Sequence, residues 1–85
     1  MPESFTFHTD PGHGWLEVPL PALQELGISE DISSYSYTDG QNVYLEEDCD
    51  AGKFVVAFEK AHGSRPKIVE KYAEYTHIRN LARFS

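Results

Sequence analysis

Long apolar runs, cysteine and early positive charge are the features that this 85-residue sequence lacks or nearly lacks. No stretch of about 18 apolar residues occurs, so no segment is expected to span a membrane. The N-terminal MPESFTFH has neither a basic stretch nor an apolar core, which predicts no secretory signal. Cys49 is the only cysteine and cannot form a disulfide within the chain. Small secreted domains usually have several, so the sequence predicts a cytoplasmic protein.

Motifs for nucleotide binding and hydrolysis are missing as well. The sequence contains no GxGxxG, P-loop, GxSxG or HExxH pattern, and PGHG at 11–14 is a turn with no helix after it. Apolar residues make up 40% of the chain and aromatic residues 13%, which suffices for a packed core. We therefore expect one domain, residues 1–85, that is not an enzyme and uses no cofactor.

Charge is divided unevenly between the two parts of the chain. Residues 1–52 carry eleven acidic and no basic side chains, and residues 53–85 carry seven basic and three acidic ones. The formal charges are therefore −11 and +4, which sum to the net charge of −7. Such asymmetry predicts either an electrostatic match between the two parts or two faces with different partners.

The hydrophobic patterns predict an α+β fold. Strand-like alternation is followed by helical spacing, and we expect an antiparallel sheet of four to five strands with two to three short helices packed on one face. The best helix is DCDAGKFVVAFEKAH, where apolar residues recur at i, i+3, i+4 and i+7. Strands are predicted at 4–8, 14–18, within 33–46 and at 67–75, and helices at 21–26, 48–62 and 77–84. The segment 67–75 could also be helical, but Pro66 and the end of the preceding helix favour a strand.

The second hairpin, within 33–46, has a register that the sequence can be used to predict. A three-residue loop at 39–41 would pair Tyr37 with Val43 and Tyr35 with Leu45, which places these four residues on one face. A one-residue slip would move every side chain to the other face, so the apolar match should decide the register.

The stretch YLEEDCDAG, residues 44–52, contains four carboxylates where a strand should end and a helix begin. A helix N-terminus favours acids, each by about 0.3–1 kcal/mol, and Asp48 or Asp50 is a natural N-cap. Like charges so close together repel, however, so capping does not explain the whole cluster.

A binding surface for another protein is the function that we expect from these acids. An acidic face attracts basic proteins, including those that handle nucleic acid, and exposed tyrosines would anchor them. The predicted contact residues are Glu46, Glu47, Asp48, Asp50, Tyr35 and Tyr37. Direct nucleic-acid binding is disfavoured by the charge, although the pair Arg79 and Arg83 leaves it open. Pairing of acidic and basic parts between two copies would instead give a homodimer.

Cysteine chemistry and metal binding are the alternatives. The carboxylates flanking Cys49 would raise the pKa of its thiol, so we expect no catalytic role. His8, Asp10 and His13 could bind a transition metal if the turn between them brought the three side chains together. The alternative is that His8 and His13 are exposed polar residues that flank a turn. A metal-binding protein or a small metal-dependent enzyme is therefore the second hypothesis.

The segments DPGHGWLEVP, SSYSY and YLEEDCDA, with a looser echo in HIRNLARF, form a combination of motifs. It resembles a pattern in small uncharacterised proteins of proteobacteria and of their phages and plasmids. The resemblance covers about residues 5–51 and implies a bacterial or phage cytosol and an accessory role, such as inhibition of a host enzyme. No activity is attached to the pattern, so it implies no catalytic residues.

Overall fold

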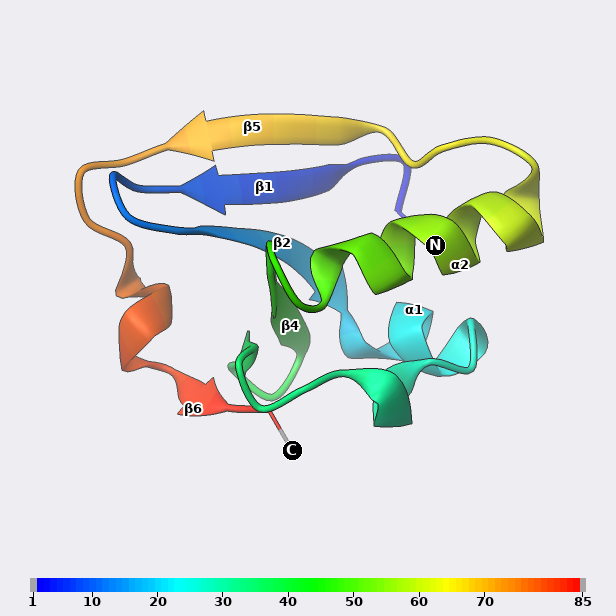
Figure 1. Ribbon diagram of the computed structural model, residues 1–85, viewed down its shortest axis with the longest axis horizontal. Coiled ribbons are helices and arrows are strands. Elements are labelled where there is room, and N and C mark those ends of the chain that lie inside the picture. The colour runs from blue at the N-terminus through cyan, green and yellow to red at the C-terminus, as the bar shows by residue number, and fades with distance from the viewer. Residues whose placement is uncertain (1, 85) are drawn as a thin grey trace.

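A six-stranded sheet forms the centre of the computed structural model, which describes residues 2–84 (Figure 1). The architecture is α+β, as predicted. The strands are β1 (Phe5–Thr9), β2 (Gly14–Pro19), β3 (Tyr37–Thr38), β4 (Asn42–Glu46), β5 (Ile68–Tyr72) and β6 (Ala82–Arg83). The helices are α1 (Leu20–Glu25) and α2 (Ala51–His62), with single 3-10 turns η1 (Ser29–Asp31) and η2 (His77–Asn80). No helix within 2–84 has the length and apolar character needed to cross a membrane.

The strand order is β5-β1-β2-β4-β3-β6, so the prediction of four to five strands was too low. The prediction of an antiparallel sheet was also incomplete, because β1 and β5 pair in parallel. A helix that returns across a sheet delivers the next strand in a parallel direction. In Figure 1, α2 makes this return, and the arrows of β1 and β5 point the same way.

The C-terminal segment differs most from its prediction. We expected a helix at 77–84, but helical structure ends after the single turn η2, and the chain then extends as β6. β6 pairs with β3, where Tyr37 lies opposite Arg83 and Thr38 opposite Ala82. In this pairing the backbone N–H of Phe84 donates a hydrogen bond to the carbonyl oxygen of Ser36, a contact that a helix at 77–84 would not have made. The strand prediction for 67–75 is confirmed by β5.

The register of the β3–β4 hairpin also differs from the prediction. Tyr37 lies opposite Tyr44, and Thr38 lies opposite Val43. The cause is the Asp39 side chain, which accepts hydrogen bonds from the backbone N–H groups of Gln41 (2.9 Å) and Asn42 (2.8 Å). This turn occupies four residues, 39–42, instead of three, so the partners shift by one position.

Two apolar clusters lie on opposite faces of the sheet. Strand side chains alternate between faces, so β2 sends Leu16 and Val18 to one side and Trp15 to the other. The larger cluster lies under α1 and α2, as the prediction of helices on one face required. Its buried members are Phe5, Leu16, Val18, Ala22, Leu23, Ile32, Val43, Leu45 and Phe54. The smaller cluster, Trp15, Tyr44 and Ile78, is covered by the C-terminal segment.

Candidate functional site

A cleft with a volume of about 440 Å³ opens on the face of the sheet that carries the smaller cluster. It brings together aromatic, acidic and guanidinium side chains from six parts of the chain. These are the β1–β2 turn, β2, the β3 region, the end of β4 with its connection to α2, η2 and β6. The lining residues, called the arginine-aromatic cleft below, are His13, Trp15, Tyr35, Tyr37, Glu46, Asp48, Cys49, Arg79 and Arg83.

Asp10 fastens one wall of this cleft. Its carboxylate accepts hydrogen bonds from the backbone N–H groups of Gly12 and His13, both at 2.9 Å, which shapes the β1–β2 turn. The same carboxylate receives Nε (3.2 Å) and Nη2 (2.9 Å) of Arg79, and these hydrogen bonds hold the pKa of Asp10 well below its usual range. A Cβ at Gly12 would lie 3.3 Å from Arg79 Nη2, so glycine leaves room for the guanidinium.

The two arginines lie over aromatic rings. The guanidinium carbon of Arg79 is 5.2 Å from the centre of the Trp15 ring, and that of Arg83 is 5.2 Å from the centre of the Tyr37 ring. Such cation–π contacts hold a planar charge in place. Arg83 also donates to the carbonyl oxygen of Ser34 at 3.0 Å. Within residues 2–84, no carboxylate forms an ion pair with Arg83.

Trp15 carries an unused hydrogen-bond donor. The residue is 1% exposed, and its indole Nε1 has no hydrogen-bond partner among the described residues. Buried indole N–H groups usually find a partner. Trp15 therefore forms a buried wall of the cleft and carries a polar atom whose hydrogen bond is not made within residues 2–84.

The acidic cluster divides into different roles. Glu46 Oε2 accepts hydrogen bonds from the backbone N–H groups of Asp48 (3.0 Å) and Cys49 (2.8 Å), and so shapes the connection to α2. The interaction with Glu46 also raises the pKa of the Cys49 thiol, with burial and the other nearby acids adding to the effect. The raised pKa agrees with the effect expected from the flanking carboxylates, and a thiol with a raised pKa is a poor nucleophile at neutral pH.

Asp50 is completely buried, which corrects its assignment as a contact residue. It occupies the N-cap position of α2 but makes no side-chain cap bond. Its carboxylate instead accepts the Ser33 N–H (3.1 Å), the hydroxyl groups of Ser33 (2.7 Å) and Ser36 (2.5 Å), and Lys53 Nζ (3.1 Å). Burial alone would raise the pKa of Asp50, but the hydrogen bonds from Ser36 and Ser33 lower it.

The structure brings four of the six predicted contact residues together. Tyr35, Tyr37, Glu46 and Asp48 all line the cleft. Glu47 is exposed but lies outside the lining, beside Gly14. Trp15, Arg79 and Arg83 were not predicted to share this site. In the sequence, Arg79 and Arg83 were noted only as a pair four residues apart. Because a helix was predicted there, their contacts with the sheet were not expected.

The three candidate metal ligands are not brought together. His8 Nε2 lies 2.7 Å from Glu17 Oε1, Asp10 is engaged by Arg79, and the ring of His13 contacts the carbonyl of Gly12. Over residues 2–84, no group of three or more His, Cys, Asp or Glu side chains is placed to hold a metal ion.

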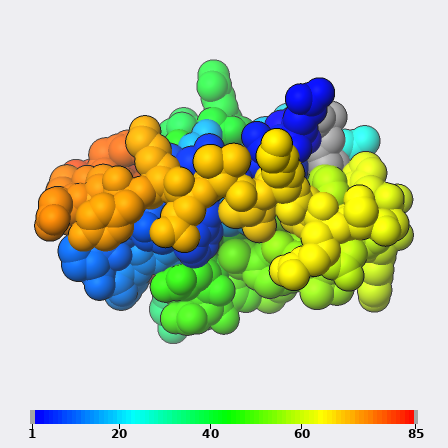
Figure 2. All heavy atoms as spheres, turned by 90° about the horizontal axis from the view of Figure 1, so that it is seen from above, coloured from blue at the N-terminus to red at the C-terminus, as the bar shows by residue number. Residues whose placement is uncertain are grey.

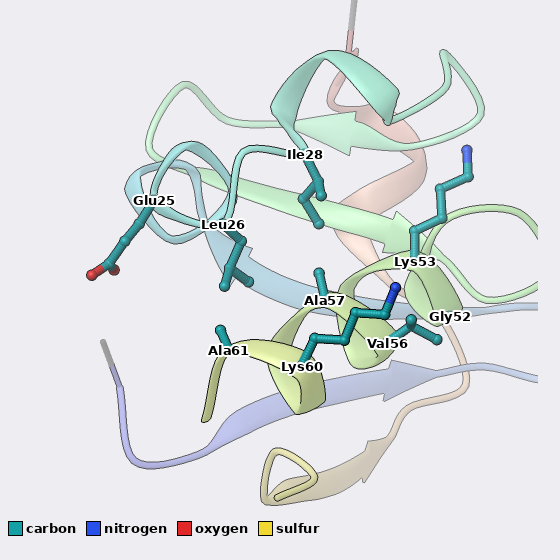
Figure 3. Close-up of a pocket in the computed structure, with 9 residues that line it drawn as sticks. All are labelled: Glu25, Leu26, Ile28, Gly52, Lys53, Val56, Ala57, Lys60 and Ala61. Carbon is teal, nitrogen blue, oxygen red and sulfur yellow. The ribbon is translucent and has the colours of Figure 1, made fainter. Parts of the chain in front are cut away.

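A second concavity, of about 810 Å³, lies between the end of α1 and α2. Figure 3 shows Leu26 and Ile28 on one side and Ala57 and Ala61 on the other. Lys53, at its rim, is already bound to Asp50 and to the carbonyl of Asp31. The groove is open and mostly apolar and has few converging polar groups, so the arginine-aromatic cleft is the stronger candidate site.

Comparison with protein-family models, with curated proteins and with solved structures gives no match.

Stability at acid pH should report on the carboxylates that build this region. The pKa values of Asp10, Asp39 and Asp50 are all lowered in the folded protein from 3.8. The unfolded chain therefore binds protons more readily, and the stabilisation, complete above about pH 4, is lost as the pH falls through the folded values. Urea unfolding at pH 7, 4 and 2.5 should show a steep fall below pH 4. An unchanged midpoint at pH 2.5 would contradict these contacts.

Proposed function

We propose that the protein is a non-enzymatic binding module that holds a segment of a partner protein in the arginine-aromatic cleft. The observation that carries the proposal is the convergence of one tryptophan, two tyrosines and two arginines in a single concavity. These three residue types dominate the energetics of protein–protein interfaces, particularly where they line a pocket. Tyr35 is 62% exposed, so its ring is available to a partner without any rearrangement of the core.

The charges in the cleft suggest what the partner presents. Glu46 and Asp48 would receive a lysine or arginine, and Arg83, with no carboxylate partner in residues 2–84, would receive a carboxylate or a backbone carbonyl. The net charge of −7 would steer a basic protein toward the molecule. The proposed partner is therefore a basic protein, a class that includes proteins that handle nucleic acid. The proposed role of the module is accessory or inhibitory.

Peptide selection tests this proposal directly. Peptides selected from a random library for binding to the protein should be enriched in basic residues, and their affinity can be followed by the fluorescence of Trp15, the only tryptophan. Asp48→Lys and Tyr35→Ala should each weaken binding about tenfold, because one reverses a charge in the cleft and the other removes an anchor. Both side chains are exposed, so the thermal midpoint should hardly change.

Glu3→Lys is the matched control. It changes the net charge as Asp48→Lys does, but Glu3 is exposed, precedes β1 and lies outside the lining. This variant should bind the selected peptides within about twofold of the original protein. If Glu3→Lys and Asp48→Lys lost the same affinity, the effect would come from the overall charge and not from the cleft. If Asp48→Lys and Tyr35→Ala both bound the peptides undiminished, the cleft would not be the binding site.

A further inference from the structure

β5, at the outer edge of the sheet, carries three of the six large apolar side chains that are exposed within residues 2–84. All five residues of the strand are exposed, and Ile68, Val69 and Tyr72 are 43%, 50% and 58% exposed. Figure 2 looks down on this edge and shows the side chains of β5, in yellow to orange, at the surface. β5 pairs with β1 on one side only and ends the sheet on the other. An exposed edge of this length is a template for another strand.

The hydrogen bonds to β1 show which backbone groups of β5 are free. Phe5 donates its N–H to the carbonyl of Lys67, and Ala73 donates to the carbonyl of Thr9. In a parallel ladder with this register, the odd-numbered residues of β5 therefore direct their N–H and C=O groups to β1. Ile68, Glu70 and Tyr72 direct theirs away from the sheet, where a further strand would bind them.

A second copy of the chain does not fit this edge. In an antiparallel pair, two residues that lie opposite each other both direct their backbone N–H and C=O groups toward the partner strand, or both direct them away. An even-numbered residue of β5 can therefore lie opposite only an even-numbered residue of the second copy, and an odd-numbered residue opposite only an odd-numbered one. The central register places Glu70 opposite Glu70. A shift by one step either way places Lys71 opposite Lys71, or Lys67 opposite Lys71. Like charges directly opposite each other are destabilising, so each of these self-pairings is opposed.

We infer that β5 is the docking edge for an extended segment of a different protein, one that adds antiparallel to the sheet and presents a basic residue opposite Glu70 and an acidic residue opposite Lys71. No ion pair within residues 2–84 uses Glu70 or Lys71, so both charges are available to it. Apolar or aromatic residues of the segment would cover Ile68, Val69 and Tyr72, as in strand addition generally. This edge is separate from the arginine-aromatic cleft and does not depend on the function proposed for it.

The peptide TVEKVYT has the required pattern, with its lysine opposite Glu70 and its glutamate opposite Lys71. Titration into the isotopically labelled protein, followed by amide NMR, should shift the resonances of residues 68–72. Exchange of the outward amides of Ile68, Glu70 and Tyr72 should slow on binding, whereas Val69 and Lys71, which already bond to β1, should change little. Absence of binding, or protection at other residues only, would overturn the inference.

Two comparisons separate strand addition from nonspecific adhesion. The same peptide with an N-methyl group on its lysine keeps every side chain but loses a ladder hydrogen bond, and should lose measurable binding. The charge-swapped peptide TVKEVYT should bind about fivefold more weakly, since two attractive cross-strand pairs become repulsive. The affinity of TVKEVYT should be restored when it binds the variant Glu70→Lys/Lys71→Glu, in which both charges are reversed. Equal binding by the N-methylated peptide, or no recovery on the swapped variant, would also overturn the proposal.

Discussion

Replacing Asp50 with alanine is expected to lower the free energy of unfolding by about 3 kcal/mol, because buried donors would lose their acceptor. The carboxylate is completely buried and joins the start of α2 to the segment that leads into β3. It accepts hydrogen bonds from Ser33 and Ser36 and from the ammonium group of Lys53. A domain of this size is marginally stable, so such a loss would leave much of the chain unfolded at physiological temperature.

Urea unfolding measured by circular dichroism provides the test. Asp50→Asn keeps the shape and one acceptor oxygen, so it should fall between the original protein and the alanine variant. Asp48→Ala, two residues away and exposed, should change the free energy of unfolding by less than about 0.5 kcal/mol. Similar effects at positions 48 and 50 would show that Asp50 is not the centre of a buried network.

Arg79→Ala should greatly weaken peptide binding in the arginine-aromatic cleft. The side chain covers the Trp15 ring and satisfies Asp10, whose carboxylate shapes the opposite turn. Its removal should detach η2 from that turn and weaken binding of selected peptides by about tenfold or more. The emission of Trp15 should shift to longer wavelength as water reaches the ring.

Arg79→Lys distinguishes the shape of the guanidinium from its charge. An ammonium group cannot reproduce the hydrogen bonds from Nε and Nη2 to Asp10 or stack in the same way on Trp15. The lysine variant should therefore recover only part of the affinity and of the original emission. Full recovery would mean that charge alone matters at this position, and an unchanged Trp15 spectrum in Arg79→Ala would contradict the stacking.

Sequence periodicity was sufficient for the elements whose pattern is local. The β1–β2 hairpin, α1 and α2 were predicted near their observed positions, because alternation and helical spacing each reflect one buried face. β5 is exposed along its whole length and was predicted instead from Pro66 and the end of the preceding helix. The β3–β4 register was missed because it depends on how the Asp39 side chain folds back on Gln41 and Asn42. The prediction of a helix at 77–84 was wrong because the pairing of β6 with β3 outweighed a helical pattern only a few residues long.

The candidate site was predictable only in part, for a related reason. Tyr35, Tyr37, Glu46 and Asp48 stood out by residue type and local density, and the cleft contains them. Asp50 has the same charge as its neighbours, and only the position of Ser33 and Ser36 in space shows that it is buried. Arg79 meets Asp10 across 69 positions in the sequence, a contact that no local pattern can indicate.

The NMR signal of the Trp15 indole N–H tests whether the arginine-aromatic cleft is the binding site. The chain has one tryptophan, so this group gives one NMR signal, and Nε1 has no hydrogen-bond partner within residues 2–84. Titration with a selected basic peptide should shift this signal together with the amides of Tyr35, Tyr37 and Arg83, all with one dissociation constant. A peptide that binds while these resonances stay in place would show that the cleft is not the binding site.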